Sequence, residues 1–166
     1  MDFTLRDFQS NHLEALWRID QECFPPGIAY SKAELRAYIA SPAAFAIVAE
    51  IAAPKFKTAE SSLYPEAGSS SPIVGFIVAE ANRKGIGHII TIDVLPEGRH
   101  SGIGFALLTA AEERLRRAQC ERVRLEAAVD NAVALSFYKR HGYAVVKTIR
   151  GYYSDGGDAY LLAKAL

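Results

Sequence analysis

Residues 92–104 read IDVLPEGRHSGIG and join a strand-like apolar run to a long run with helical periodicity. This junction has little side-chain bulk, because it contains Gly98, Ser101, Gly102 and Gly104. Free backbone N–H groups at the start of a helix bind anions, and glycine lets a phosphate come close to the main chain. Arg99 adds a fixed positive charge. The stretch therefore predicts a strand, a phosphate-binding loop and a helix that receive a di- or polyphosphate.

Two other phosphate-binding patterns do not match this segment. The dinucleotide fingerprint needs a third glycine or alanine where Leu107 stands. The Walker pattern ends in Gly-Lys-Ser/Thr, whereas Phe105 follows Gly104. What remains is Arg-x-x-Gly-x-Gly after a strand. Taken alone, it is also compatible with a glycine-rich turn into a core helix.

Alternating strand-like and helical runs surround this segment and predict one mixed α/β domain over residues 1–166. We expect strands at about 4–6, 44–52, 73–81, 88–94, 122–128, 143–150 and 158–164. We expect helices at about 11–24, 31–42, 102–119 and 132–141. The first helix has Ser10 or Asn11 as its N-cap, and the second begins with the capping box Ser31-Lys32-Ala33-Glu34.

The helix at 102–119 shows an amphipathic pattern. Its expected apolar face consists of Leu108, Ala111, Leu115 and Ala118. On the outer face, Glu112 is spaced to pair with Arg116, and Glu113 with Arg117. Between two of the strands, residues of about 54–72 are rich in Ser, Pro, Ala and Gly and are expected to form a long loop. That loop is either a tolerated insertion or a functional flap.

The composition narrows the function classes. Nineteen basic residues balance nineteen acidic residues among 166, so a protein that coats nucleic acid is not expected. No run approaches the roughly 18 apolar residues that span a membrane. Cys23 and Cys120 stand alone, without metal-ligand spacing, so we expect no metal, no disulfide framework and a cytoplasmic location.

Two separated segments together resemble the GCN5-related N-acetyltransferase (GNAT) superfamily. Arg99-x-x-Gly102-x-Gly104 resembles its acetyl-CoA signature, and Asn131-x6-Tyr138 followed by Gly142-Tyr143 resembles its second hallmark. The resemblance implies a GNAT fold, with a mostly antiparallel sheet of about seven strands flanked by about four helices, and acetyl-CoA as cofactor. The residues that it implies for coenzyme contact are Ile92, Asp93, Val94, Arg99, His100, Ser101, Gly102, Ile103, Gly104, Asn131, Phe137 and Tyr138.

The resemblance also implies catalytic roles, each with a structural alternative. Glu126 is the expected general base, or else it forms an ion pair with Arg124 or Arg122. Tyr138 is the expected acid for the departing thiolate, or else it packs on the helix. Asn131 either binds the pantetheine arm or caps a helix. A backbone N–H near Val94 is the expected oxyanion donor. His88 is expected at the surface or in packing.

Among the members of the GNAT superfamily, the sequence is most similar to protein N-terminal acetyltransferases, including those that act on the N-terminal alanine of a ribosomal protein. The similarity includes the turn Tyr152-Tyr153-Ser154-Asp155-Gly156-Gly157 and the segment around Tyr30. Tyr30, Tyr152 and Tyr153 are therefore expected to line the acceptor groove, or else to pack. The expected acceptor is the α-amine of a protein or peptide. A small-molecule amine and a non-catalytic acyl-CoA-binding module are the alternatives.

Overall fold

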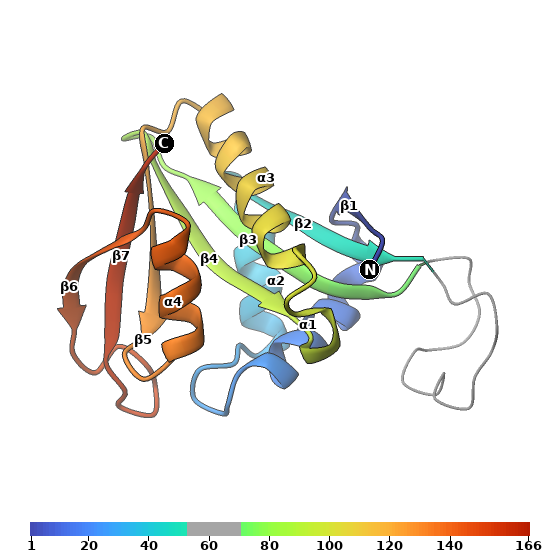
Figure 1. Cartoon of the computed structure of the whole chain (residues 1–166), viewed down its shortest axis with the longest axis horizontal. Coiled ribbons are helices and arrows are strands. Elements are labelled where there is room, and N and C mark those ends of the chain that lie inside the picture. Colours follow the sequence, from blue (N-terminus) through green and yellow to red (C-terminus); the bar gives the residue numbers. More distant parts are fainter. Residues whose placement is uncertain (53–70) are drawn as a thin grey trace.

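The computed structural model describes residues 1–52 and 71–166. Its strands form one seven-stranded sheet in the order β1-β2-β3-β4-β5-β7-β6 (Figure 1). Neighbouring strands run antiparallel except for β4 and β5, which are parallel. The strands are β1 (Phe3–Asp7), β2 (Ala44–Ile51), β3 (Ile73–Ala81), β4 (Ile86–Val94), β5 (Arg122–Ala128), β6 (Ala144–Ile149) and β7 (Ala159–Ala165). The expected mixed, mostly antiparallel sheet is confirmed.

The helices of the described residues are α1 (Leu13–Cys23), α2 (Lys32–Ala40), α3 (Ile103–Arg117) and α4 (Ala132–Arg140). In Figure 1, α3 and α4 lie in front of the sheet, and α1 and α2 lie behind it. None of these helices has the length and apolar character needed to cross a membrane. Most of the loop expected at 54–72 lies outside the described residues.

Each face of the sheet carries its own apolar core. Leu107 and Leu115 of α3 pack with Ile77, Ile89 and Leu125 on one face. On the other face, Leu16 and Ile19 of α1 and Leu35 of α2 pack with Val48 and Phe76. Each fully buried leucine contributes about 1.5–3 kcal/mol of transfer free energy, so the two layers fix the helices to the sheet.

The local start signals are confirmed for α2 and differ for α1. The Ser31 hydroxyl accepts from the Glu34 N–H at 3.1 Å, and a Glu34 oxygen accepts from the Ser31 N–H at 2.7 Å. Before α1, a 3₁₀ turn covers Ser10–His12, and the Gln9 N–H donates to Nδ1 of His12. The expected cap at Ser10 or Asn11 was therefore wrong, because a short turn precedes the helix.

The pattern expected for α3 needs two corrections. Ala118 is exposed, because the helix ends at Arg117, and Leu107 belongs to the buried face. Glu112 forms the expected pair with Arg116, 3.7 Å away, but it is only 4% exposed and therefore not on the outer face. Its carboxylate accepts from Nζ of Lys164 on β7 and from the Tyr143 hydroxyl. Glu113 does form the exposed pair with Arg117, at 3.1 Å.

The sheet opens between β4 and β5. The two strands pair only from Ile86 to His88 on β4 and from Arg122 to Arg124 on β5. Beyond these residues they diverge, as Figure 1 shows toward the end of β4 that leads into α3. Among the described strands, the backbone of residues 89–94 therefore has no partner on the β5 side, and the opening forms a large cleft.

Candidate active site

The cleft between the diverging strands has a volume of about 1000 Å³. Its walls come from β4, β5, the start of α3, α4, the segment after α1 and the turn before β7. Most of the site residues expected from sequence meet in this cleft. They are Tyr30, Ile92, Asp93, Val94, Arg99, His100, Gly102, Gly104, Glu126, Asn131, Phe137, Tyr138, Tyr152 and Tyr153.

Two expected residues do not line the cleft. The side chain of Ile103 is fully buried in the core beneath α3. The Ser101 hydroxyl donates to the Gly98 carbonyl and so shapes the loop from within. Any contact of these two residues with a ligand in the cleft is therefore limited to their backbone.

One end of the cleft is suited to an anion. Gly102 stands before α3 with φ +87°, and a Cβ built on it meets nothing within 4 Å. Among the described residues, no side chain caps the first turn of α3, so its first N–H groups are open to a ligand. Arg99, His100 and Arg140 line the same end. The loop geometry and the charge together suit this end to an anion.

In the middle of the site, the structure brings Glu126 and His88 together. Nε2 of His88 lies 2.7 Å from Oε2 of Glu126, whose side chain is 9% exposed. Nδ1 of His88 lies 3.8 Å from a Glu80 oxygen, and Arg124 lies 3.8 Å from Oε1 of Glu126. Glu126 thus belongs to a short polar chain that ends in the cleft. The expectation that His88 serves only the surface or packing was too narrow.

Tyr138 lines the cleft from α4 and is 7% exposed. Its ring meets Phe137 and Tyr143 edge-on, with centroids 5.3 and 5.7 Å apart. Burial raises the pKa of its hydroxyl above the usual value for tyrosine. The hydroxyl therefore stays protonated at neutral pH and is able to donate.

Asn131 caps α4. Its side-chain oxygen accepts from the Ala134 N–H at 3.1 Å. It also lines the cleft. The helix-capping alternative for Asn131 is therefore present in the structure, and the cap fixes the helix that carries Tyr138.

The other end of the cleft is bounded by two loops that touch each other. Tyr30 follows α1, whereas Tyr152 and Tyr153 precede β7. The Ser154 hydroxyl donates to the Gly27 carbonyl at 2.8 Å. A Cβ on Gly27 would lie 2.9 Å from Cβ of Asp155, and the φ of Gly27 is +92°. The two loops therefore form a bridge across this end.

Sequence reasoning missed several lining residues, including Cys23, Thr91, Phe105 and His141. No local signal identifies them, because they reach the cleft through tertiary packing.

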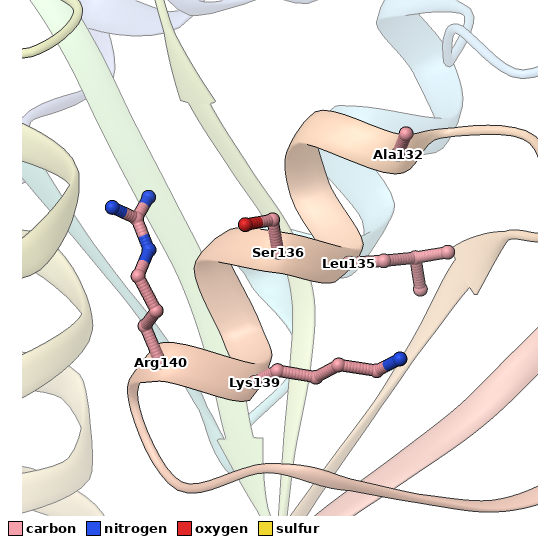
Figure 2. A pocket seen from close by; sticks show the side chains of 5 residues that line it. All are labelled: Ala132, Leu135, Ser136, Lys139 and Arg140. Atoms are coloured by element: carbon pink, nitrogen blue, oxygen red, sulfur yellow. The ribbon is translucent and has the colours of Figure 1, made fainter.

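A separate hollow lies along α4, where Ser136 and Arg140 extend to one side and Leu135 and Lys139 to the other (Figure 2). Its polar groups do not converge. Within residues 1–52 and 71–166, no three His, Cys, Asp or Glu side chains could hold a metal ion.

Comparison with known proteins agrees with this geometry. The N-alpha-acetyltransferase of Sulfurisphaera tokodaii is 44% identical over 81 residues, which are 48% of each chain. The chain thus spans about half the length of the N-alpha-acetyltransferases that it matches. The structure of Ard1 from Thermoplasma volcanium has a TM-score of 0.82 at 25% identity, covering 100% of this chain and 99% of that one.

A further solved structure shares the fold. The NatC complex bound to Gag peptide and CoA contains a chain with a TM-score of 0.76 at 22% identity, covering 100% of this chain and 99% of its own. The sequence profile of the Acetyltransferase (GNAT) family matches residues 13–143, from α1 to the residue before β6. This match takes in both of the segments that carried the resemblance, and the chain belongs to the GNAT acetyltransferase family.

Proposed function

We propose that the protein transfers an acetyl group from acetyl-CoA to the N-terminal α-amine of a protein or peptide, by direct attack in a ternary complex. One observation carries the proposal. A single cleft holds an anion-binding end at α3, the Glu126–His88 pair and Tyr138 in its middle, and a bridged acceptor end.

The residues at the α3 end are suited to a coenzyme A group. Arg99, His100 and the open space at Gly102 would hold its phosphates. The unpaired backbone edge at residues 89–94 would hydrogen-bond an extended arm. Acetyl-CoA, when bound, supplies the acetyl group as an activated thioester.

The middle of the cleft provides an acid and a base. A peptide α-amine has a pKa of about 8, so a carboxylate is a sufficient proton acceptor near neutral pH. Glu126 takes that role, directly or through a water, while His88 orients its carboxylate. The protonated hydroxyl of Tyr138 gives a proton to the leaving sulfur.

The bridged loops favour a chain end as the acceptor. An internal lysine carries polypeptide on both sides of its side chain, whereas an N-terminus carries it on one side only. The contact between Ser154 and Gly27 narrows the acceptor end, so a single extended chain enters with the least obstruction. The names of the relatives, N-alpha-acetyltransferases, support the same choice.

The test uses acetyl-CoA with a panel of peptides that have free or blocked N-termini, some with internal lysines, and measures the thiol released. We expect turnover only with free N-termini. Glu126→Gln should lower kcat by about 100-fold while CoA still binds. Turnover confined to small amines or to blocked, lysine-containing peptides contradicts the proposed acceptor. A Glu126→Gln, Tyr138→Phe variant with unchanged thiol release contradicts the mechanism. The cytoplasmic location stays a prediction.

A further inference from the structure

Two buried acidic residues have no role in the mechanism above. Asp20 on α1 is 0% exposed and Asp93 on β4 is 1% exposed. Asp93 lines the cleft. In the part of the chain that the structure describes, no Lys, Arg or His forms an ion pair with either carboxyl group. Burying unpaired charge is costly, so both acids need an explanation.

Asp20 holds the backbone of Tyr30. Its Oδ2 accepts from the Tyr30 N–H at 2.7 Å and from Nε2 of Gln21 at 3.3 Å. Nε2 of Gln21 also donates to the Tyr30 carbonyl at 2.7 Å. Both backbone polar groups of Tyr30 are thus bound from α1, and the ring of this residue forms part of the acceptor wall. Asp20 therefore determines where that wall stands.

The other oxygen of Asp20 lacks a donor. Oδ1 is buried and has no hydrogen-bond partner among the described residues. Asp93 accepts from the Thr91 hydroxyl, whose Oγ1 lies 3.2 and 3.4 Å from its two oxygens. Neither acid has a cationic partner among the described residues, so a proton on Asp93 would remove the cost of a second buried charge.

The charges around the two acids oppose a second ionisation. Burial and the charge of Asp20 raise the pKa of Asp93 well above its usual value. Burial raises the pKa of Asp20 to about 6, and Glu34 on α2 acts in the same direction. Two other titratable groups, Cys23 on α1 and Tyr138 on α4, have pKa values that a charge on Asp93 would raise. Neither group is cationic. One negative charge is therefore the stable state of the pair.

We propose that Asp20 is a positioning residue for the acetyl transfer, with its carboxylate holding Tyr30 in the acceptor wall, and that the buried Asp93 is protonated. The kinetic part of this inference rests on the proposed function. Asp20 acts on acceptor binding, since it reaches the substrate only through Tyr30. It leaves the anion-binding end at Gly102 unchanged.

The kinetic test compares alanine with amide variants. We expect Asp20→Ala to raise the KM for the peptide acceptor about tenfold, since a buried hydrogen bond to a charged group is lost, while the KM for acetyl-CoA changes by less than about twofold. Asp20→Asn should recover most of the loss, because its side-chain oxygen still accepts from Tyr30.

The matched control is Glu113→Gln, which removes an exposed carboxylate and should leave both KM values unchanged. Two kinetic results overturn the inference. These are equal rises of both KM values in Asp20→Ala, or no recovery in Asp20→Asn.

A measurement without turnover separates this inference from the proposed function. Infrared spectra of the wild-type protein at neutral pH should contain the band of a protonated, buried carboxyl group, and Asp93→Asn should lack it. A band that survives in Asp93→Asn and disappears in Asp20→Asn places the proton on the wrong acid and refutes the assignment. If no acceptor is acetylated at all, the proposed function fails, and the spectra still decide the protonation of the pair.

Discussion

Replacing Glu112 by alanine removes a buried carboxylate that joins α3 to β7. Its oxygens lie 2.8 and 3.0 Å from Nζ of Lys164 and 2.9 Å from the Tyr143 hydroxyl. Arg116 also lies 3.7 Å from the carboxylate, so the change leaves an ammonium, a phenol and a half-exposed guanidinium without their partner. Breaking a buried pair by removing one partner costs about 3–5 kcal/mol. The Lys164 side chain is 24% exposed and water can solvate part of its charge, so we expect the lower end, about 3 kcal/mol.

The assay is urea unfolding followed by circular dichroism, together with a thermal melt. For a chain of this size, about 3 kcal/mol corresponds to a fall in Tm of roughly 6–12 °C. The control is Glu113→Ala on the next residue of α3. Its carboxylate pairs with Arg117 in solvent, at side-chain exposures of 57% and 76%, and removing it should cost under about 0.5 kcal/mol. If the two variants unfold within about 1 kcal/mol of each other, the reasoning on buried charge fails.

Three further changes test other parts of the structure. Asn131→Ala should lower the free energy of unfolding by about 1 kcal/mol, because the Ala134 N–H loses its acceptor, and a melt unchanged from wild type would contradict the cap. Gly102→Ala should lower the free energy of unfolding by about 1 kcal/mol, since its φ of +87° strains any side chain even in open space. Calorimetry should show that this variant binds CoA more weakly than the wild type. Equal affinity would place the phosphates of CoA elsewhere. Burial raises the pKa of Asp20 from 3.8 to about 6, so the stability that its proton provides is complete below about pH 3.8 and is lost as the pH rises through about 6. Urea unfolding between about pH 4 and 7 should therefore show the wild type losing stability relative to Asp20→Asn, and parallel curves would contradict the shift.

Local rules of sequence predicted the order of the elements and the loop before α3. The structure contains three features that depend on residues close together in the chain. These are the Ser31 capping box, the strand at 122–128 and the glycine-rich loop at 98–104. The features that the sequence did not predict depend on contacts between residues far apart in the chain. Glu112 follows an exposed periodicity, yet Lys164 reaches it from a strand 52 residues away.

The pairing of His88 with Glu126 shows the same limit. These residues are 38 positions apart, and they meet because β4 and β5 pair briefly at this point before they diverge. Helical periodicity likewise does not tell where α3 stops, which is why Ala118 was placed in the core although it is exposed.

The bridge at Gly27 has a consequence for how this family member can change. Any side chain at Gly27 is opposed twice, by a positive φ and by Asp155 on the facing loop. The two loops that border the acceptor end therefore have to be altered as a pair. A loop transplanted alone from a relative would meet an unmatched surface, so attempts to redirect the acceptor preference should exchange both segments in a single step.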